Sequence, residues 1–167
     1  MRDELIQIVD ENNREIGTAP RRRMRAEVLI HRACYILVSN SAGELLLQRR
    51  TLTKDIYPGA LEVAAGGVVL AGESYELSAA RELAEELGIC GVELRRRFDH
   101  FHDAPDNRVW GRVYTCTWDG RLILQPEEVS EAFFLPPAEA LARCRCEPST
   151  PDGRVILERL LAQPAGE

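Results

Sequence analysis

The sequence predicts an α+β fold in which strands come before and after a central helix and two more helices lie near the C-terminus. Stretches rich in β-branched, aliphatic and aromatic residues, bounded by turn residues, are spread along much of the chain. Helical periodicity is clearest at 73–88 and recurs at 136–144 and 150–163. This order of elements is typical of a mixed β-sheet packed against helices.

The size and charge of the chain limit what it can be. With 167 residues, 45% of them hydrophobic, the chain can bury one substantial core and is too short to divide comfortably into two. We therefore expect a single domain over 1–167. The formal charge of −6 and pI near 5.2 argue against a general nucleic-acid or anionic-membrane binder, so any anion site must be local.

The N-terminal sequence and the cysteines indicate the compartment. "MRDELIQIVD" lacks the apolar stretch of a secretory signal, and the longest apolar run, around "VAAGGVVLAG", is too short to cross a bilayer. We expect a cytoplasmic protein without a membrane partner. The five cysteines are an odd, scattered set, so free thiols are expected.

The elements before the central helix are mostly extended. Two apolar stretches around "DENN" predict a hairpin over about 4–19, and the basic run "RRRMR" at 21–25 is expected to face solvent or pair with acids. Strands at about 33–39 and 44–49 flank the turn "NSAG". The segment "TLTKDIYPG", 51–59, is expected to be a loop.

The central helix is the clearest single element. Ser74 is a suitable N-terminal cap, and Gly88 stands where a left-handed C-terminal cap is expected. The predicted apolar stripe consists of Leu77, Ala80, Leu83, Ala84 and Leu87. Before this helix, two short extended pieces surround Gly66 and Gly67, whose lack of a side chain allows a close backbone approach.

The elements after the helix complete the pattern. Strands are predicted at 92–102, 108–118 and 131–135, and helices at 136–144 and 150–163. Thr150 is expected to cap the last helix, with Pro151 in its first turn.

Three carboxylates are crowded onto the central helix. At about 100° per residue, Glu82, Glu85 and Glu86 share one face, roughly opposite Leu77, Ala80 and Ala84. Like charges at this spacing repel, and most charge runs are simply solvated surface. The neighbouring residues distinguish this run from an ordinary one.

The spacing from Gly67 to Ile89 follows a known motif. Gly67 and Glu73 are followed by "REL" at 81–83, "EE" at 85–86 and "GI" at 88–89, which resembles the Nudix box at every specified position. The segments "VDENNREIG", "HRACYILVSNSAGELLLQRR" and "GRVYTCTW" extend a looser resemblance over nearly the whole chain. They are similar to bacterial Nudix hydrolases related to isopentenyl-diphosphate isomerase. The fold that this implies is a mixed sheet sandwiched between α-helices.

The resemblance implies a metal site on the helix. Glu82, Glu85 and Glu86 would bind Mg²⁺, for which Mn²⁺ can substitute, and the carbonyl of Gly67 would be a further ligand. Mg²⁺ prefers hard oxygen ligands, and a dication relieves the repulsion among the glutamates. Glu82, Glu85 and Arg81 are the expected catalytic residues, with Glu82 a candidate base for the attacking water. Glu73 and Arg81 would form a carboxylate–guanidinium pair that fixes the loop against the helix.

Residues outside the motif are candidates for the remaining roles. Related enzymes use another acid from a distant loop, and "QPEEVSEAFFL" offers Glu127, Glu128 and Glu131. Glu131 is the first choice because it directly precedes the apolar residues of the predicted strand. Arg49, Arg50 and Lys54 are candidates for binding substrate phosphates, although neighbouring strand residues face opposite sides and only one of the two arginines is expected at the site. Tyr57 and Trp110 are candidates for stacking on a base.

Three functions remain open. The first is metal-dependent hydrolysis of a diphosphate bond in a small molecule, a nucleoside diphosphate linked to another group. The second is isomerisation of an isoprenoid diphosphate, which the family's isomerases perform with a cysteine just before the box, where this chain has Gly66. The third is a nucleotide sensor without catalysis. Pro105 resembles a marker of ADP-ribose-cleaving relatives but is also an ordinary loop residue, and the N-terminal hairpin could extend the sheet or form a homodimer.

Overall fold

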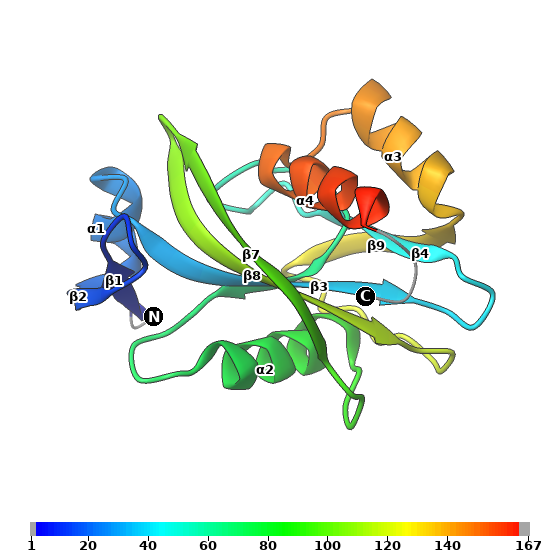
Figure 1. The fold of residues 1–167 in the computed structure, drawn as a ribbon, viewed down its shortest axis with the longest axis horizontal. Helices are drawn as coiled ribbons and strands as arrows, with labels where there is room; N and C mark the ends of the chain where they lie inside the picture. The colour runs from blue at the N-terminus through cyan, green and yellow to red at the C-terminus, as the bar shows by residue number, and fades with distance from the viewer. Residues whose placement is uncertain (1–2, 164–167) are drawn as a thin grey trace.

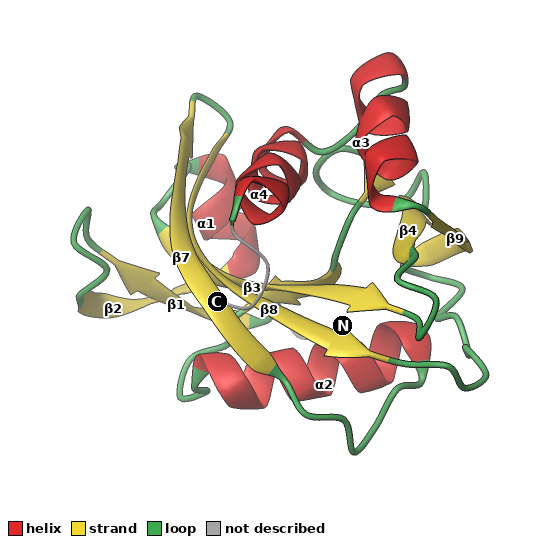
Figure 2. Cartoon of the chain, turned by 45° about the vertical axis from the view of Figure 1, so that its right-hand side comes forward, coloured by secondary structure: helices red, strands yellow, loops and turns green. Residues whose placement is uncertain are grey.

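The computed structural model describes residues 3–163 and confirms the α+β prediction, with a mixed nine-stranded sheet over that range and helices on both of its faces (Figures 1 and 2). The strands are β1 (Leu5–Val9), β2 (Glu15–Pro20), β3 (His31–Ser39), β4 (Leu45–Arg50), β5 (Leu61–Glu62), β6 (Ala65–Val68), β7 (Arg95–Ala104), β8 (Asn107–Thr117) and β9 (Val129–Leu135). The helices are α1 (Arg21–Ala26), α2 (Tyr75–Leu87), α3 (Pro137–Cys146) and α4 (Pro151–Ala162).

Strand β3 organises the sheet. It runs parallel to β8 along its whole length and antiparallel to β6, with Cys34 opposite Gly67 and Tyr35 opposite Gly66. At its two ends it meets β1 and β4, both antiparallel. The sheet is therefore mixed, and the two glycines of β6 lie directly beside its central strand.

The core has one layer on each side of β3. Because successive strand residues face opposite sides, Cys34, Ile36 and Val38 pack towards α2 in one cluster of buried residues. Leu37 and its neighbours Ala33 and Tyr35 belong to the other cluster, which includes buried residues of α3 and α4. Figure 2 shows α2 on one face of the sheet and α3 and α4 on the other. Burial on both faces anchors β3 and the elements attached to it.

Helix α2 has the predicted ends but a different buried face. The hydroxyl of Ser74 accepts a hydrogen bond from the backbone of Leu77 at 3.1 Å, and Gly88 has a left-handed φ of 69°. The expected stripe is wrong at Leu77, which is 59% exposed, and at Ala80, which is also exposed. The buried residues are Tyr75, Ser78, Ala79, Leu83, Glu86 and Leu87. Contact with β6 and β3 decides which face is covered, and that face includes a glutamate.

The N-terminal part adds one element that the sequence pattern did not predict. The hairpin β1–β2 is confirmed, and the basic run after it forms α1, in which only Met24 is buried. Arg21 and Arg25 both contact Asp55 of the 51–59 loop, with Nε–Oδ2 distances of 3.0 and 3.2 Å. The run thus pairs with an acid, as expected, and also ties the hairpin to the loop.

Two features near the C-terminus differ from the predictions. Strand β9 begins at Val129, earlier than predicted, so Glu131 lies inside the strand, opposite Arg49 of β4, instead of at its beginning. Helix α4 follows Thr150 as expected, but the Thr150 hydroxyl makes no capping hydrogen bond.

The part of the chain that the structure describes contains no helix long and apolar enough to cross a membrane. All five cysteines are free thiols, as the sequence predicted.

His31, at the start of β3, gives the fold a specific pH dependence. Burial lowers the pKa of its imidazole to about 4, although the hydrogen bond from Nδ1 to the carbonyl of Leu29 opposes this shift; Arg25 and Arg21 act with burial, and Asp55 against it. The pKa of this base is lower in the folded protein than its value of 6.5 in the unfolded chain, so the stability of the fold is unaffected above pH 6.5. Stability is lost as the pH falls from 6.5 towards 4, because the unfolded chain then binds the proton more readily.

We therefore expect protonation of His31 to lower the free energy of unfolding by about 2 kcal/mol when the pH falls from about 7.5 to about 5. The measurement is urea unfolding at both pH values for the wild type and for His31→Gln, which removes the titrating group. The variant should lose about 2 kcal/mol less than the wild type over this interval. Equal losses in the two proteins would contradict the assignment.

Candidate active site

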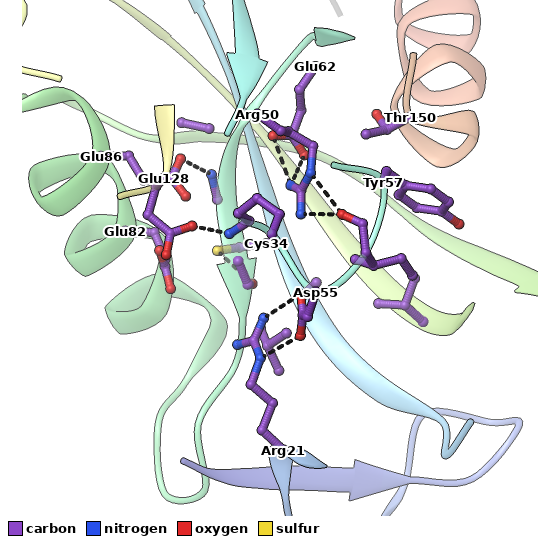
Figure 3. A pocket seen from close by; sticks show the side chains of 18 of the residues that line it. Arg21, Cys34, Arg50, Asp55, Tyr57, Glu62, Glu82, Glu86, Glu128 and Thr150 are labelled. Atoms are coloured by element: carbon purple, nitrogen blue, oxygen red, sulfur yellow. Dashed lines mark hydrogen bonds and ion pairs between the residues drawn. The ribbon is translucent and has the colours of Figure 1, made fainter. Parts of the chain in front are cut away.

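One cleft of about 820 Å³ brings together α2, the glycines of β6, the 51–59 loop, α1 and the start of α4. Figure 3 shows Glu82 and Glu86 on one side of it, Tyr57 and Thr150 on the opposite side, and Arg21 with Asp55 along another edge. The cleft therefore has a strongly acidic side, formed by the glutamates of the motif, and another side with both positively and negatively charged side chains.

Glu73 and Arg81 form the expected clamp between loop and helix. The Arg81 Nε and Nη2 donate to the two carboxylate oxygens of Glu73 at 2.8 and 3.0 Å. Burial acts to raise the pKa of Glu73, but the hydrogen bonds and charge of Arg81 outweigh burial and lower it. The same pairing raises the pKa of Arg81. This two-point contact fixes the loop before α2 against the first half of the helix.

Arg81 also holds two glutamates of its own helix. Its Nη1 donates to Glu82 Oε1 at 3.0 Å and to Glu85 Oε2 at 3.3 Å. Glu82 packs tightly over Gly67, where an added Cβ would lie 2.6 Å from Glu82 Oε1. Burial raises the pKa of Glu82, with Arg81 opposing and Glu85 reinforcing the shift. A side chain at position 67 would therefore push the Glu82 carboxylate out of this position.

Glu86 is the unusual member of the group, because it is only 5% exposed. Its Oε2 accepts hydrogen bonds from the backbone of Gly66 and from Gln48 Nε2, both at 3.3 Å. Burial raises the pKa of Glu86 well above the ordinary value, and the nearby charges of Glu62 and Glu82 raise it further. A buried carboxylate with only neutral donors is costly, so the site is strongly receptive to a positive charge.

Gly66 has a backbone conformation that other residues rarely adopt. Its φ is 143°, and a Cβ at this position would lie 2.0 Å from the carbonyl oxygen of Cys34 on the adjacent strand. Only glycine fits, and this conformation aims the Gly66 amide at Glu86. Gly66 therefore donates its amide to Glu86, and Gly67 leaves space beside Glu82.

Arg50 and Lys54 line the cleft and are already paired. Arg50 Nη1 donates to both oxygens of Glu62 at 3.1 and 3.2 Å, and its Nε and Nη2 donate to the carbonyl of Ile56. Lys54 contacts the carboxylate of Glu128. Arg50 therefore braces the 51–59 loop, and Lys54 links that loop to the segment before β9.

Arg49 and Glu131 are placed away from the cleft. Neither is among its lining residues, which include Glu127 and Glu128 instead. Arg49 donates through Nε to Glu131 at 2.9 Å and through Nη2 to Glu147 at 3.4 Å. Successive strand residues point to opposite faces, so Arg50 and Arg49 cannot serve the same site.

Several residues of the cleft were not predicted as site residues. Arg21 and Arg25 come from α1, and Asp152 comes from the first turn of α4. Tyr57, considered only for stacking, stands in the loop beside them. A basic run followed later by an acid in a loop is too common a pattern to identify such a cluster, because only the tertiary fold brings these segments together.

The acidic side fits a hard divalent cation by its chemistry. Its ligand atoms are carboxylate oxygens, and no cation within residues 3–163 forms an ion pair with the buried Glu86, although the charge of Lys54 opposes the rise in its pKa. Within residues 3–163, no three Asp, Glu, His or Cys side chains form a preformed metal cage, and the oxygens of Glu82 and Glu85 lie against Arg81 instead. A cation would therefore compete with Arg81 for these two carboxylates.

Comparison with known proteins identifies the family. The NUDIX domain family matches residues 29–160. An uncharacterised Nudix hydrolase of Pseudomonas aeruginosa, PA4841, is 52% identical over 158 residues, which cover 95% of this chain and 94% of that protein. YfcD of Escherichia coli K12, also an uncharacterised Nudix hydrolase, is 46% identical over 149 residues, 89% of this chain and 82% of YfcD.

A solved structure has a similar fold. DR0079 from Deinococcus radiodurans superposes with a TM-score of 0.81 at 28% identity, covering 93% of this chain and 98% of that protein. Nudix hydrolases generally require divalent cations, which agrees with the chemistry of the acidic side. With most of its length matched by the family and relatives this similar, the chain belongs to the NUDIX domain family and is a Nudix hydrolase.

Proposed function

We propose that the protein hydrolyses a diphosphate bond in a nucleoside diphosphate linked to another moiety, with Mg²⁺ held by Glu82, Glu85 and Glu86. The observation that carries this proposal is the buried Glu86 carboxylate, which accepts from the Gly66 amide near the charges of Glu62 and Glu82 and forms no ion pair with a cation of residues 3–163. A purely structural glutamate at such a position would be costly, whereas a cation site explains it.

The chain's own residues supply the remaining steps. When bound, the cation would neutralise the diphosphate and lower the pKa of an attacking water. Glu82 is the proposed base for that water, since its carboxylate lines the cleft and is oriented by Arg81. Arg81 positions Glu82 and Glu85, and Glu73 anchors Arg81. Lys54, and Arg50 where it can leave Glu62, are placed to contact phosphate oxygens.

The distant acid of the proposal is Glu128. It lines the cleft beside Lys54, whereas Glu131 is paired with Arg49 outside it. Glu128 stands three residues before Glu131 in the same segment, so the two form a matched pair for mutation.

The whole chain is proposed to work as one unit. Arg21, Arg22 and Arg25 lie before residue 29, where the family match begins, yet they line the same cleft as the glutamates. Removing the N-terminal hairpin and α1 would remove one wall of the site.

The other two functions have less support. We still propose that the chain is related to the isopentenyl-diphosphate isomerases. However, it has Gly66 at the position where those enzymes carry a cysteine. Cys34 does line the cleft, but burial raises the pKa of its thiol to about 12. A sensor would not need the complete set of carboxylates around Glu86.

A substrate panel tests the proposed function. ADP-ribose, a dinucleotide, UDP-glucose, nucleoside di- and triphosphates and isopentenyl diphosphate are each incubated with Mg²⁺, with Mn²⁺ and with EDTA, and the products are identified by ³¹P NMR. We expect cleavage of at least one nucleoside diphosphate compound into two phosphorylated products, and no cleavage in EDTA. Isomerised isopentenyl diphosphate with no hydrolysis of any compound would overturn the proposal.

A further inference from the structure

Two polar atoms in the wall of the cleft lack hydrogen-bond partners. Among the buried side-chain atoms of residues 3–163, Asp152 Oδ1 and Tyr57 Oη have none. Both residues line the cleft. Figure 3 shows Tyr57 beside Thr150, the residue before α4, on the side opposite Glu82 and Glu86. Such groups are costly to leave unsatisfied in a native protein.

The hydrogen bond from Tyr35 uses only one of the two carboxylate oxygens of Asp152. Tyr35 donates its hydroxyl hydrogen to Asp152 Oδ2 at 2.5 Å, and Asp152 is only 6% exposed. Burial, together with the charge of Asp152, raises the pKa of Tyr35 well above its usual value, so the phenol keeps its proton. Tyr35 therefore fixes the carboxylate and occupies one oxygen, while Oδ1 is left without a donor although neighbouring atoms cover it.

Tyr57 is held in place at some cost. Its φ of 49° is in the left-handed region, which costs a residue with a side chain about 1 kcal/mol. The loop on its N-terminal side is anchored twice, by Arg50 at the carbonyl of Ile56 and by Arg21 at Asp55. The Tyr57 hydroxyl makes no hydrogen bond of normal geometry, but Asn107 lies close enough to act against burial on the pKa of the phenol, which burial raises. A strained residue on an anchored loop is a common feature of ligand-binding sites.

We propose that Asp152 and Tyr57 form a subsite that recognises a neutral hydroxyl group on the organic part of the substrate. A hydroxyl is complementary to this pair, since it can donate to Asp152 Oδ1 and accept from Tyr57 Oη. A phosphate is disfavoured because it would meet the carboxylate. The inference rests on the proposed function, and it narrows the substrate to diphosphates of a hydroxylated group such as a sugar, excluding isoprenoid diphosphates.

The test uses two substitutions that keep the shape of the site. Asp152→Asn can still accept from Tyr35 but presents an N–H donor where Oδ1 stood, and Tyr57→Phe removes only the hydroxyl. Tyr114→Phe is the matched control, because Tyr114 donates to Glu76 and does not line the cleft. Thermal unfolding of each variant checks the fold.

The kinetics are measured with Mg²⁺ on the sugar or nucleoside diphosphate that the wild type cleaves best, and on inorganic pyrophosphate, which has no organic hydroxyl. We expect KM for the hydroxylated substrate to rise about tenfold in Asp152→Asn and about fivefold in Tyr57→Phe, with kcat within about twofold. Tyr114→Phe should match the wild type, and no variant should change kinetics on pyrophosphate.

The outcomes separate this inference from the proposed function. Unchanged KM values in both cleft variants, or a wild type that prefers isopentenyl diphosphate, would overturn the subsite alone. If the wild type cleaves nothing, the hydrolase proposal is wrong. The subsite is then tested by calorimetry, which measures the affinity of the wild type and Asp152→Asn for ADP-ribose in the presence of Mg²⁺. Binding weakened by Asp152→Asn would support it, and equal binding or no binding would overturn it as well.

Discussion

Glu86→Gln is expected to lower kcat/KM for Mg²⁺-dependent diphosphate hydrolysis by about 10³-fold. The substitution keeps the size of the side chain and its ability to accept from Gly66 and Gln48. It removes a charge worth several kcal/mol to a bound cation, and each 1.36 kcal/mol is about a factor of ten in rate. Steady-state kinetics at saturating Mg²⁺ on the best substrate measure this loss.

The same variant should be more stable than the wild type when no divalent cation is present. Glu86 buries a carboxylate beside Glu62 and Glu82, and glutamine removes that unfavourable charge. We expect a gain of about 1 to 3 kcal/mol in the free energy of unfolding, measured with urea in EDTA. Lost activity together with gained stability indicates a residue kept for function.

The control for Glu86→Gln is Glu139→Gln, in the exposed first turn of α3. It makes the same chemical change away from the cleft and should leave both activity and stability near wild type. Undiminished hydrolysis by Glu86→Gln would contradict the proposed metal site. A large loss of stability would indicate that Glu86 supports the fold instead.

Glu128→Gln is expected to lower kcat/KM by about 10²-fold, whereas Glu131→Gln should stay within about threefold of the wild type. Glu128 lines the cleft and contacts Lys54, and Glu131 is half exposed and paired with Arg49 on the other side of the strand. Both changes remove one carboxylate from the same segment, so each serves as a control for the other. Kinetics on one substrate decide between them.

Loss of Glu128 also leaves Lys54 without its partner, which the double variant Glu128→Gln/Lys54→Met takes into account. Because Lys54 is itself proposed to contact phosphate, the double variant should be less active than Glu128→Gln, whereas recovered activity would show that the unpaired lysine causes the defect. A strong effect of Glu131→Gln with a silent Glu128→Gln would favour the acid expected from the sequence over the one in the cleft.

The sequence predicted the parts of the site that depend on local chemistry. Ser74 and Gly88 mark the ends of α2 because capping depends on residues within one turn. The clamp between Glu73 and Arg81 followed from the spacing of the motif. In each case the contact involves residues close in sequence, which a linear pattern can encode.

The burial of α2 could not be predicted from its own residues. Leu77 is the more hydrophobic candidate for burial, yet it faces solvent while Glu86 is covered. The covered side is decided by the approach of β6, whose Gly66 brings the backbone within reach of Glu86. A carboxylate is buried there against its intrinsic preference, as expected when function outweighs stability.

The opposite side of the cleft depends entirely on distant contacts. Tyr35 and Asp152 are 117 residues apart in sequence, and Tyr57 lines the same cleft from a loop. The register of β4 and β9 likewise decided that Arg49 meets Glu131. One sequence alone carries no signal for such pairings, since each residue type is ordinary in its own segment.

Mn²⁺ binding to α2, measured without substrate by electron paramagnetic resonance titration, tests the proposed cation site without any assumption about the substrate. We expect saturable binding by the wild type and by Glu139→Gln, binding weakened at least about tenfold in Glu86→Gln, and competition by Mg²⁺. Equal Mn²⁺ affinity in the wild type and Glu86→Gln would show that the cation binds elsewhere.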